Sequence, residues 1–140
     1  MSQIVRTENV SGVNSFQQGV ELSQAGNYEA ALLLFDEAIR LQPNSYDVWN
    51  EKGNALINLG RHGEAIACFE RAIACDPTIP ATYYSLGWAA YVTERYELAI
   101  ANFQKTLELQ SDFPKSYVYL WCMRKGEETA YPAGKGKRPD

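Results

Sequence analysis

Apolar and small residues recur at helical spacing along most of the chain, in paired runs separated by short breaks. Between residues 46 and 77, two such runs lie on either side of Gly60, and Pro77 ends the second. Their apolar or small positions are Trp49, Gly53, Leu56, Ala65, Phe69 and Ala72. Spacings of three and four residues place side chains on one face of a helix. The stretch therefore predicts a helix-turn-helix unit.

The same unit occurs three times, at an interval of 34 residues and without insertions. Glycine recurs in the first helix of each unit, while alanine and phenylalanine recur in the second. The matching positions are Gly19, Gly53 and Gly87, then Ala31, Ala65 and Ala99, then Phe35, Phe69 and Phe103. Three copies in phase predict tandem repeats over residues 12–45, 46–79 and 80–113.

The recurring glycines carry a structural prediction of their own. A glycine inside a helix costs about 1 kcal/mol relative to alanine, so its recurrence indicates a neighbouring helix that passes too close for a Cβ atom. We expect the recurring alanines to face these glycines. The phenylalanines are expected to fill the seam between consecutive helix pairs.

This spacing resembles the tetratricopeptide repeat, a 34-residue helix-turn-helix whose second helix carries A-x3-F followed by alanine and proline. The resemblance covers residues 12–113 and implies an all-α fold, a right-handed α-solenoid. The third copy departs from the family pattern, because Glu94 replaces the turn glycine, Thr106 the small alanine and Ser111 the proline. We expect these departures to weaken the local geometry of that copy slightly.

The segments outside the repeats have other patterns. Residues 1–11 are polar without a clear period, which predicts a flexible leader. Residues 114–125 begin with a proline suited to a first helical turn and carry Tyr117, Leu120 and Trp121 on one face, so we expect a seventh helix that caps the last repeat. Residues 126–140 contain three glycines and two prolines. They predict a flexible tail, solvated rather than a localisation or nucleic-acid element.

Composition and charge narrow the classes of function. The chain is 46% hydrophobic and 21% charged, as is typical of a folded globular domain. Residues 12–113 carry 13 acidic and 6 basic side chains, whereas nucleic-acid binding needs a clustered positive surface. No run approaches the roughly 18 apolar residues that span a bilayer. We expect a cytoplasmic protein with no nucleic-acid partner and no membrane insertion.

Catalytic chemistry finds little support in the sequence. His62 is the single histidine and occupies the position held by Tyr28 and Tyr96 in the other copies, which favours a surface or packing role over a general base. Cys68 and Cys75 lie about 10 Å apart along a helix, too far for a disulfide, and packing is favoured over redox sensing. No phosphate-binding loop, metal cluster or nucleophile motif is present. We expect no enzyme, no catalytic residue, no metal and no cofactor.

The family resemblance implies a binding groove on the concave side, lined by the first helix of each repeat. Positions 2, 5, 9, 12 and 13 of each copy point into such a groove, which in the first copy includes Ser23 and Gln24. We expect peptide-binding residues among Phe16, Val20, Asn50, Asn54, Asn58, Tyr84, Trp88, Tyr91 and Lys115. The arrangement of basic and asparagine residues that clamps a terminal carboxylate in some family members is matched only partly, which argues against that ligand.

Two patterns stand out among these positions. Asn50, Asn54 and Asn58 form a row on one helix face, suited to a peptide backbone because a carboxamide both donates and accepts hydrogen bonds; the alternative is a solvated polar face. Tyr84, Trp88 and Tyr91 form an aromatic stripe. Such a stripe is either core, or a set of exposed binding anchors.

Three hypotheses of function follow. The favoured one is a non-enzymatic adaptor that binds a peptide segment of a partner protein in the groove. The second is a self-associating scaffold or assembly factor, in which Tyr117 and Trp121 face another subunit and the chain forms a homo-oligomer. The third, an enzyme based on His62 and the cysteines, lacks a mutually oriented pair of catalytic groups.

Overall fold

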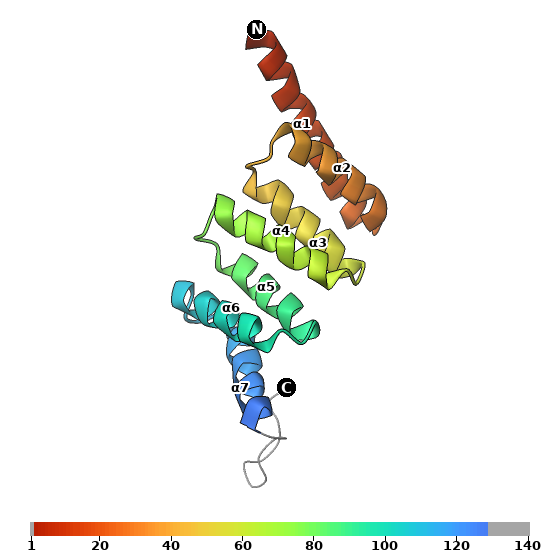
Figure 1. The fold of residues 1–140 in the computed structure, drawn as a ribbon. Coiled ribbons are helices and arrows are strands. Elements are labelled where there is room, and N and C mark those ends of the chain that lie inside the picture. The colour runs from red at the N-terminus through yellow and green to blue at the C-terminus, as the bar shows by residue number, and fades with distance from the viewer. Residues whose placement is uncertain (1, 129–140) are drawn as a thin grey trace. The chain divides into compact units, whose positions relative to one another are not determined.

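The computed structural model describes residues 2–128, and the regular structure of this part is entirely helical. Seven α-helices follow one another along the described chain. They are α1 (Ser2–Gln24), α2 (Tyr28–Leu41), α3 (Tyr46–Asn58), α4 (His62–Cys75), α5 (Pro80–Val92), α6 (Tyr96–Leu109) and α7 (Pro114–Glu128). Figure 1 shows α1–α2, α3–α4 and α5–α6 as successive hairpins. The predicted all-α class of tandem helix pairs is therefore confirmed.

The first helix is longer than the sequence pattern predicts. Residues 2–11, expected to be a flexible leader, are helical as part of α1, whose N-terminal end extends beyond α2 in Figure 1. The physical reason is local, since residues 2–11 contain no glycine or proline that would interrupt a helix. At the other end α7 reaches Glu128 instead of residue 125. The rest of the predicted tail lies outside the described residues.

The turns inside the three hairpins share one backbone feature. Gly26 and Gly60 have φ angles of 85° and 76°, in the left-handed region that glycine adopts without steric cost. Glu94 takes the same conformation with φ 62°, although it has a side chain. The third turn therefore keeps the geometry of the others, and the substitution adds local strain instead of changing the turn.

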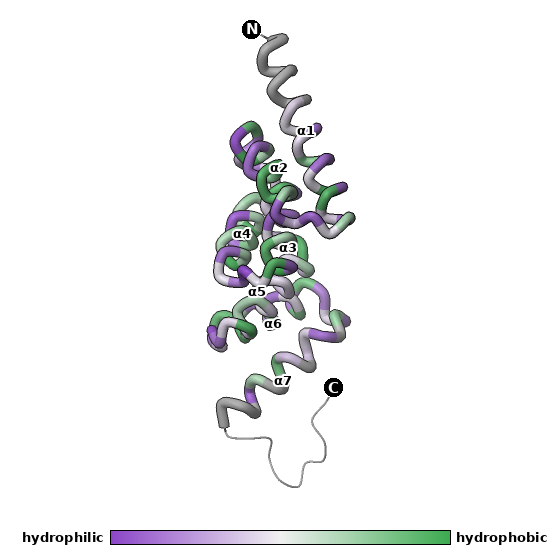
Figure 2. The backbone as a smooth tube through the Cα atoms, turned by 90° about the vertical axis from the view of Figure 1, so that its right-hand side faces the viewer, coloured by the Kyte–Doolittle hydropathy of each residue, from purple (hydrophilic) through white to green (hydrophobic). Residues whose placement is uncertain are grey.

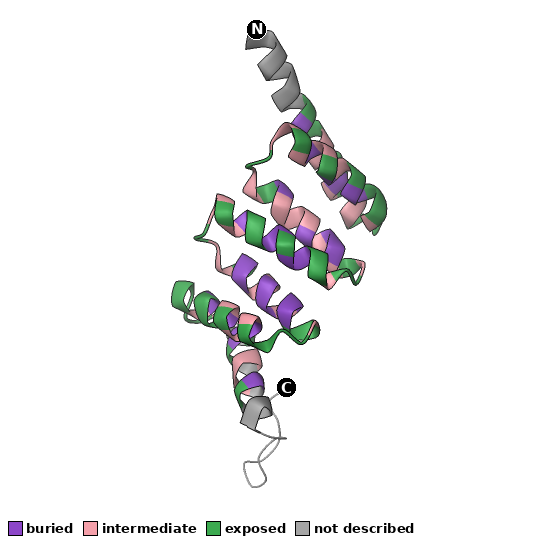
Figure 3. Ribbon diagram, viewed as in Figure 1, coloured by how far each residue is buried: buried purple, intermediate pink, exposed green. Residues whose placement is uncertain are grey.

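The core of each hairpin is built from the recurring small and aromatic residues. A Cβ atom added at Gly53 would lie 2.6 Å from the ring of Phe69, and Gly19 and Gly87 face Phe35 and Phe103 in the same way. The phenylalanine of each second helix thus presses on the glycine of its own pair, where we had expected alanine. Figure 3 shows the buried positions along α2, α4 and α6, separated by exposed ones.

The helices form two compact units, with the division between Pro77 and Thr78. The first contains α1–α4, in which α2 also packs against α3; the second contains α5–α7, in which α7 packs against α6. In Figure 2 hydrophobic and hydrophilic residues alternate along α2, as expected of a helix with one buried face. No helix within residues 2–128 is both long and apolar enough to cross a membrane.

The seventh helix covers the last hairpin through aromatic side chains. The ring of Tyr119 stacks on that of Phe103 with centroids 5.4 Å apart, and it lies 6.1 Å from the ring of Tyr84. Phe103 therefore contacts the next element along the chain, the seam role we had predicted for it. Thr106, which replaces an alanine, is fully buried and donates a hydrogen bond of 2.8 Å to the Asn102 carbonyl, so its hydroxyl is satisfied.

Candidate functional site

The first unit contains a hollow lined by residues of α1 and α3 and by the first residue of α2. Its volume is about 220 Å³. The lining residues, which define what we call the α1–α3 hollow, are Val20, Ser23, Gln24, Tyr28, Glu51, Asn54, Ala55 and Asn58. Five of them lie at groove positions predicted from the sequence: Val20, Ser23, Gln24, Asn54 and Asn58.

The position of α3 beside this hollow is fixed by packing on its opposite side. The indole nitrogen of Trp49 donates a 2.8 Å hydrogen bond to the Pro43 carbonyl, which ties the start of α3 to the preceding turn. The Arg71 guanidinium lies 5.1 Å from the centre of the Trp49 ring. Gly53 lies against Phe69 on α4, so the neighbouring Asn54 is left on the hollow side.

The asparagines of the hollow interact with each other. Asn58 Nδ2 donates a hydrogen bond of 2.9 Å to the backbone carbonyl of Asn54. This bond orients the Asn58 amide and leaves its Oδ1 as the atom suited to accept a hydrogen bond from a ligand. The Asn54 side chain is half-buried and Asn58 is exposed. The pair therefore offers polar groups at the edge of the hollow.

One acidic group also lines the hollow. Glu51 is the only charged residue among the lining residues, and burial, followed by repulsion from Asp47, raises the pKa of its carboxyl. The Ser23 hydroxyl oxygen is also buried, and it has no hydrogen-bond partner among the residues that the structure describes. The ionised carboxylate can only accept hydrogen bonds and the hydroxyl oxygen can also accept them, so a ligand that donates hydrogen bonds satisfies both groups.

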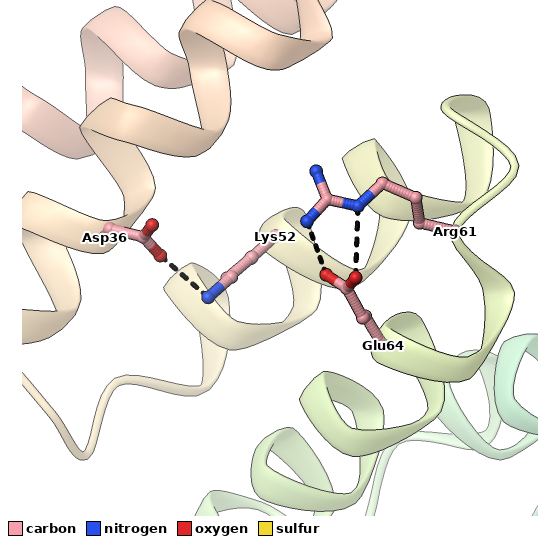
Figure 4. A network of polar contacts seen from close by, with 4 residues as sticks. All are labelled: Asp36, Lys52, Arg61 and Glu64. Carbon is pink, nitrogen blue, oxygen red and sulfur yellow. Dashed lines mark hydrogen bonds and ion pairs between the residues drawn. The ribbon is translucent and has the colours of Figure 1, made fainter.

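The four basic residues between α2 and the end of α4 interact with other groups and do not line the hollow. Lys52 pairs with Asp36 at 2.7 Å, and Arg61 pairs with Glu64 at 2.6 Å. Both pairs are drawn in Figure 4. Arg40 pairs with Glu37, and Arg71 lies over the Trp49 ring. Such surface pairs contribute little to stability, but each gives the positive charge a partner other than the hollow.

Two other predicted groove residues of this unit lie outside the hollow. The Phe16 ring is half-buried and lies 6.2 Å from that of Phe35, so it packs within the α1–α2 hairpin. Asn50 is half-buried on α3, one turn before Asn54, and does not line the hollow. The asparagine row therefore contributes two of its three members to it.

In the aromatic stripe of the second unit, Tyr84 is packed against other rings, whereas Tyr91 is exposed. Tyr84 contacts three rings, with centroids 5.8 Å from Phe103, 5.0 Å from Phe113 and 6.1 Å from Tyr119. Burial and the neighbouring Tyr119 hydroxyl raise the pKa of Tyr84 to about 12. The predicted anchor role is a poor fit for Tyr84, because its ring is already packed against α6 and α7.

The remaining predicted residues of this unit are more accessible. Trp88 is half-buried, Lys115 is exposed, and Tyr91 is 37% exposed. The Tyr91 ring still contacts those of Tyr96 and Tyr119, at 6.2 and 5.7 Å. Trp88 and Tyr91 on α5 thus remain predicted peptide-binding residues, and so does Lys115 on α7.

The groups considered for catalysis all lie on α4. Cys68 and Cys75 are thiols and form no disulfide, as their spacing predicted. Burial raises the pKa of the Cys68 thiol, which disfavours the reactive thiolate. His62 is the half-buried first residue of α4. Within the part of the chain that the structure describes, no three residues are grouped to hold a metal ion.

Three lining residues of the hollow were missed as groove residues: Tyr28, Glu51 and Ala55. All three fall outside the repeat positions that the family resemblance assigns to a groove. The signal for Glu51 was present, because it lies three residues before Asn54 and four after Asp47, which places it on the same helix face. Tyr28 begins α2, and no spacing rule within α1 or α3 could have included it.

Comparisons with protein families agree with the helical repeat. Two family models, both described as tetratricopeptide repeat, match residues 16–80 and 68–101. Together these matches span more than half of the 140-residue chain. A comparison with curated proteins finds no match.

Solved structures similar to this chain contain the same helical arrangement. The first TPR of Spaghetti (RPAP3) bound to the HSP90 peptide SRMEEVD has a TM-score of 0.81 at 16% identity, covering 86% of this chain and 96% of that one. The Arabidopsis OM64 TPR domain has a TM-score of 0.79 at 20% identity, covering 85% and 98%. MamA 41-end from Desulfovibrio magneticus RS-1 has a TM-score of 0.79 at 28% identity, covering 88% and 70%.

Proposed function

Because the chain belongs to the tetratricopeptide repeat family, whose members are generally non-enzymatic protein–protein interaction modules, we propose that it binds a short peptide segment of a partner protein at the α1–α3 hollow. The chain then acts as an adaptor, without catalysis. A structural neighbour bound to the HSP90 peptide SRMEEVD supports the idea that a fold of this kind can hold a short peptide.

The observation that carries the proposal is the convergence of Val20, Asn54 and Asn58 on one hollow. A side chain from α1 and two from α3 meet there, beside a buried hydroxyl that has no hydrogen-bond partner. A merely solvated asparagine row would not require such a recess. The chemistry of amides beside an apolar wall suits a peptide, which presents both backbone hydrogen-bonding groups and side chains.

In this proposal each residue has a distinct role. Asn54 and Asn58 hydrogen-bond the peptide backbone, while Val20 and Ala55 contact the aliphatic part of a peptide side chain. The helices are already folded, so binding requires little ordering of the protein itself. The half-buried Asn54 is expected to matter more than the exposed Asn58, because hydrogen bonds shielded from water are stronger.

A peptide-library selection tests the proposal without knowledge of the partner. The whole chain is immobilised, peptides are selected from a random library, and the Kd of each selected peptide is measured by fluorescence anisotropy. Asn54→Ala is expected to weaken binding about tenfold, the equivalent of about 1.4 kcal/mol. Asn44→Ala, the same substitution at an exposed position in the α2–α3 turn, is the matched control and should leave the Kd unchanged.

Two results would count against the hollow as the binding site. One is a set of selected peptides whose Kd is the same for the parent chain, Asn54→Ala and Asn58→Ala. The other is a selection that enriches no peptide at all, provided that circular dichroism shows the immobilised chain to be folded. In either case the adaptor function would have to use another surface, such as the one that contains Trp88 and Tyr91 on α5.

Self-association through α7 is a second candidate function. It is favoured by Tyr117, which is 53% exposed on a helix whose other aromatic residues are half-buried. We expect sedimentation velocity over a wide concentration range to show a dimer that Tyr117→Ala dissociates. A monomer at the highest concentration would exclude this candidate.

A further inference from the structure

The α1–α3 hollow is acidic where a clamp for a peptide carboxylate would be basic. Glu51 is the only charged residue of its lining, and the four basic residues between residues 11 and 77 make contacts elsewhere. We propose that the hollow is a subsite for the cationic side chain of a lysine or arginine in the bound segment. This inference rests on the proposed peptide-binding function and specifies its ligand.

The acceptors in the hollow match a ligand that only donates hydrogen bonds. Ammonium and guanidinium groups carry several donors and no acceptor. The hollow offers the Glu51 carboxylate, the Ser23 hydroxyl oxygen that lacks a partner and the Asn58 Oδ1 left available by the Asn58–Asn54 hydrogen bond. A purely apolar ligand would leave these acceptors without a partner, and an anionic ligand would be repelled by the Glu51 carboxylate.

The state of Glu51 agrees with such a ligand. Its carboxyl is half-buried and is repelled by Asp47 one turn earlier, which together raise its pKa. A cation within a few ångströms stabilises the ionised carboxylate and opposes both effects. The interaction also gains from partial burial, because charges that are shielded from water attract each other more strongly than exposed ones.

The size and walls of the hollow select a side chain over a larger ligand. A volume of about 220 Å³ is below the roughly 300–1,000 Å³ of sites that enclose a small molecule. Val20 and Ala55 supply apolar surface for the methylene groups of a long side chain. Lysine and arginine bury such a stem along apolar surface and extend the charge to polar groups beyond it.

The charge of the surrounding unit favours the same partner. Between residues 11 and 77 the chain has nine acidic residues and four basic ones. Three of the basic side chains form ion pairs with Asp36, Glu37 and Glu64, and Arg71 lies over a tryptophan ring. The resulting negative potential attracts a basic segment before contact and raises its association rate.

The experiment combines a change in the protein with one in the peptide. For peptides selected on the whole chain, Kd is measured with each lysine or arginine replaced by norleucine, on the parent chain and on Glu51→Gln. We expect selected peptides to be enriched in lysine or arginine. One replacement should weaken binding to the parent chain at least tenfold, and Glu51→Gln should weaken the unmodified peptide to a similar degree. The two changes together should cost little more than either alone, because both remove the same interaction.

Matched controls separate loss of this subsite from unfolding and from a general change in charge. Glu70→Gln, the same substitution on the exposed side of α4, should leave the Kd unchanged, and circular dichroism checks that Glu51→Gln is folded. Acetylation of the peptide N-terminus tests the other source of a cation. If acetylation abolishes binding while every norleucine replacement is tolerated, the subsite holds an α-amino group and the proposal is overturned.

A second arm needs no selected peptide. The side-chain amide signals of Asn54 and Asn58 are followed by NMR while Nα-acetyl-lysine methylamide is added, and the norleucine analogue is the control probe. Saturable shifts with the lysine probe that Glu51→Gln removes would support the subsite. Equal responses to both probes would overturn it. Peptides that respond to Asn54→Ala but not to Glu51→Gln would refute the cation subsite alone, whereas insensitivity to both variants would refute the peptide-binding site itself.

Discussion

At the scale of single residues, the turn of the third hairpin contains a residue with an unfavourable backbone conformation. Glu94 has a φ of 62° because the turn geometry of the other hairpins is imposed on it from both sides. A residue with a Cβ atom pays about 1–2 kcal/mol for this conformation. Gly26 and Gly60 occupy the same position in the other two turns without this cost, because glycine has no Cβ atom.

Replacing Glu94 with glycine should therefore stabilise the protein. Part of the relief is offset by the greater freedom of glycine in the unfolded chain, so we expect a net gain of about 0.5–1 kcal/mol in the free energy of unfolding, measured by urea denaturation. The control is Glu70→Gly inside α4, which should destabilise by about 1 kcal/mol. A loss of stability in Glu94→Gly would show that the turn is not strained.

Tyr84 provides a residue-scale prediction that depends on pH. Its pKa is about 12 in the folded protein and about 10 when unfolded, so the folded state favours the neutral phenol. The stability that this provides is complete below pH 10 and is lost as the pH rises towards 12. We expect urea midpoints to fall over this range, less steeply in Tyr84→Phe. Tyr117→Phe is the matched control, and an unchanged slope in Tyr84→Phe would refute the assignment.

At the scale of helices, the contact between glycine and phenylalanine sets the distance within each hairpin. The sequence pattern predicted close approach at Gly19, Gly53 and Gly87, and the structure confirms it. It did not identify the partner, because spacing along one helix cannot show which residue of the neighbouring helix lies opposite. The ring, not a small alanine, occupies that place.

This contact makes opposite predictions for two Gly→Ala substitutions. Gly53→Ala would place a Cβ atom 2.6 Å from the Phe69 ring, so we expect a loss of about 1–3 kcal/mol from overpacking, despite the better helix propensity of alanine. A Cβ atom at Gly63 on α4 would meet nothing within 4 Å, so Gly63→Ala should be neutral or stabilising. Calorimetry of both variants measures this, and equal melting temperatures would contradict it.

The role of α7 is tested by two tyrosines on the same helix. Tyr119 contacts Phe103, Tyr84 and Tyr91, so Tyr119→Ala should cost about 2–4 kcal/mol in unfolding free energy through lost aromatic packing. Tyr117 is 53% exposed, and Tyr117→Ala should change stability by less than about 0.5 kcal/mol. Similar losses in both variants would mean that α7 does not cap the unit through Tyr119.

At the scale of the whole molecule, the sequence predicted the fold better than the site. Helix starts at Tyr46, Pro80 and Pro114 followed from a regular interval, because periodic packing leaves a periodic sequence. The N-terminal extension of α1 could not be predicted from this interval, since it belongs to no repeat. The hollow depends on side chains from three helices, and its acidic residue breaks the family's groove pattern. Burial of Glu51 and the lack of a partner for Ser23 emerge only from the fold.

The central claim, that a peptide binds at the α1–α3 hollow, is tested most directly by NMR of the whole chain with a selected peptide. We predict that the side-chain amide signals of Asn54 and Asn58 and the methyl signals of Val20 shift together, with one Kd, and that Asn54→Ala weakens that Kd about tenfold. Shifts confined to residues outside the hollow, such as those of α7, would contradict the account.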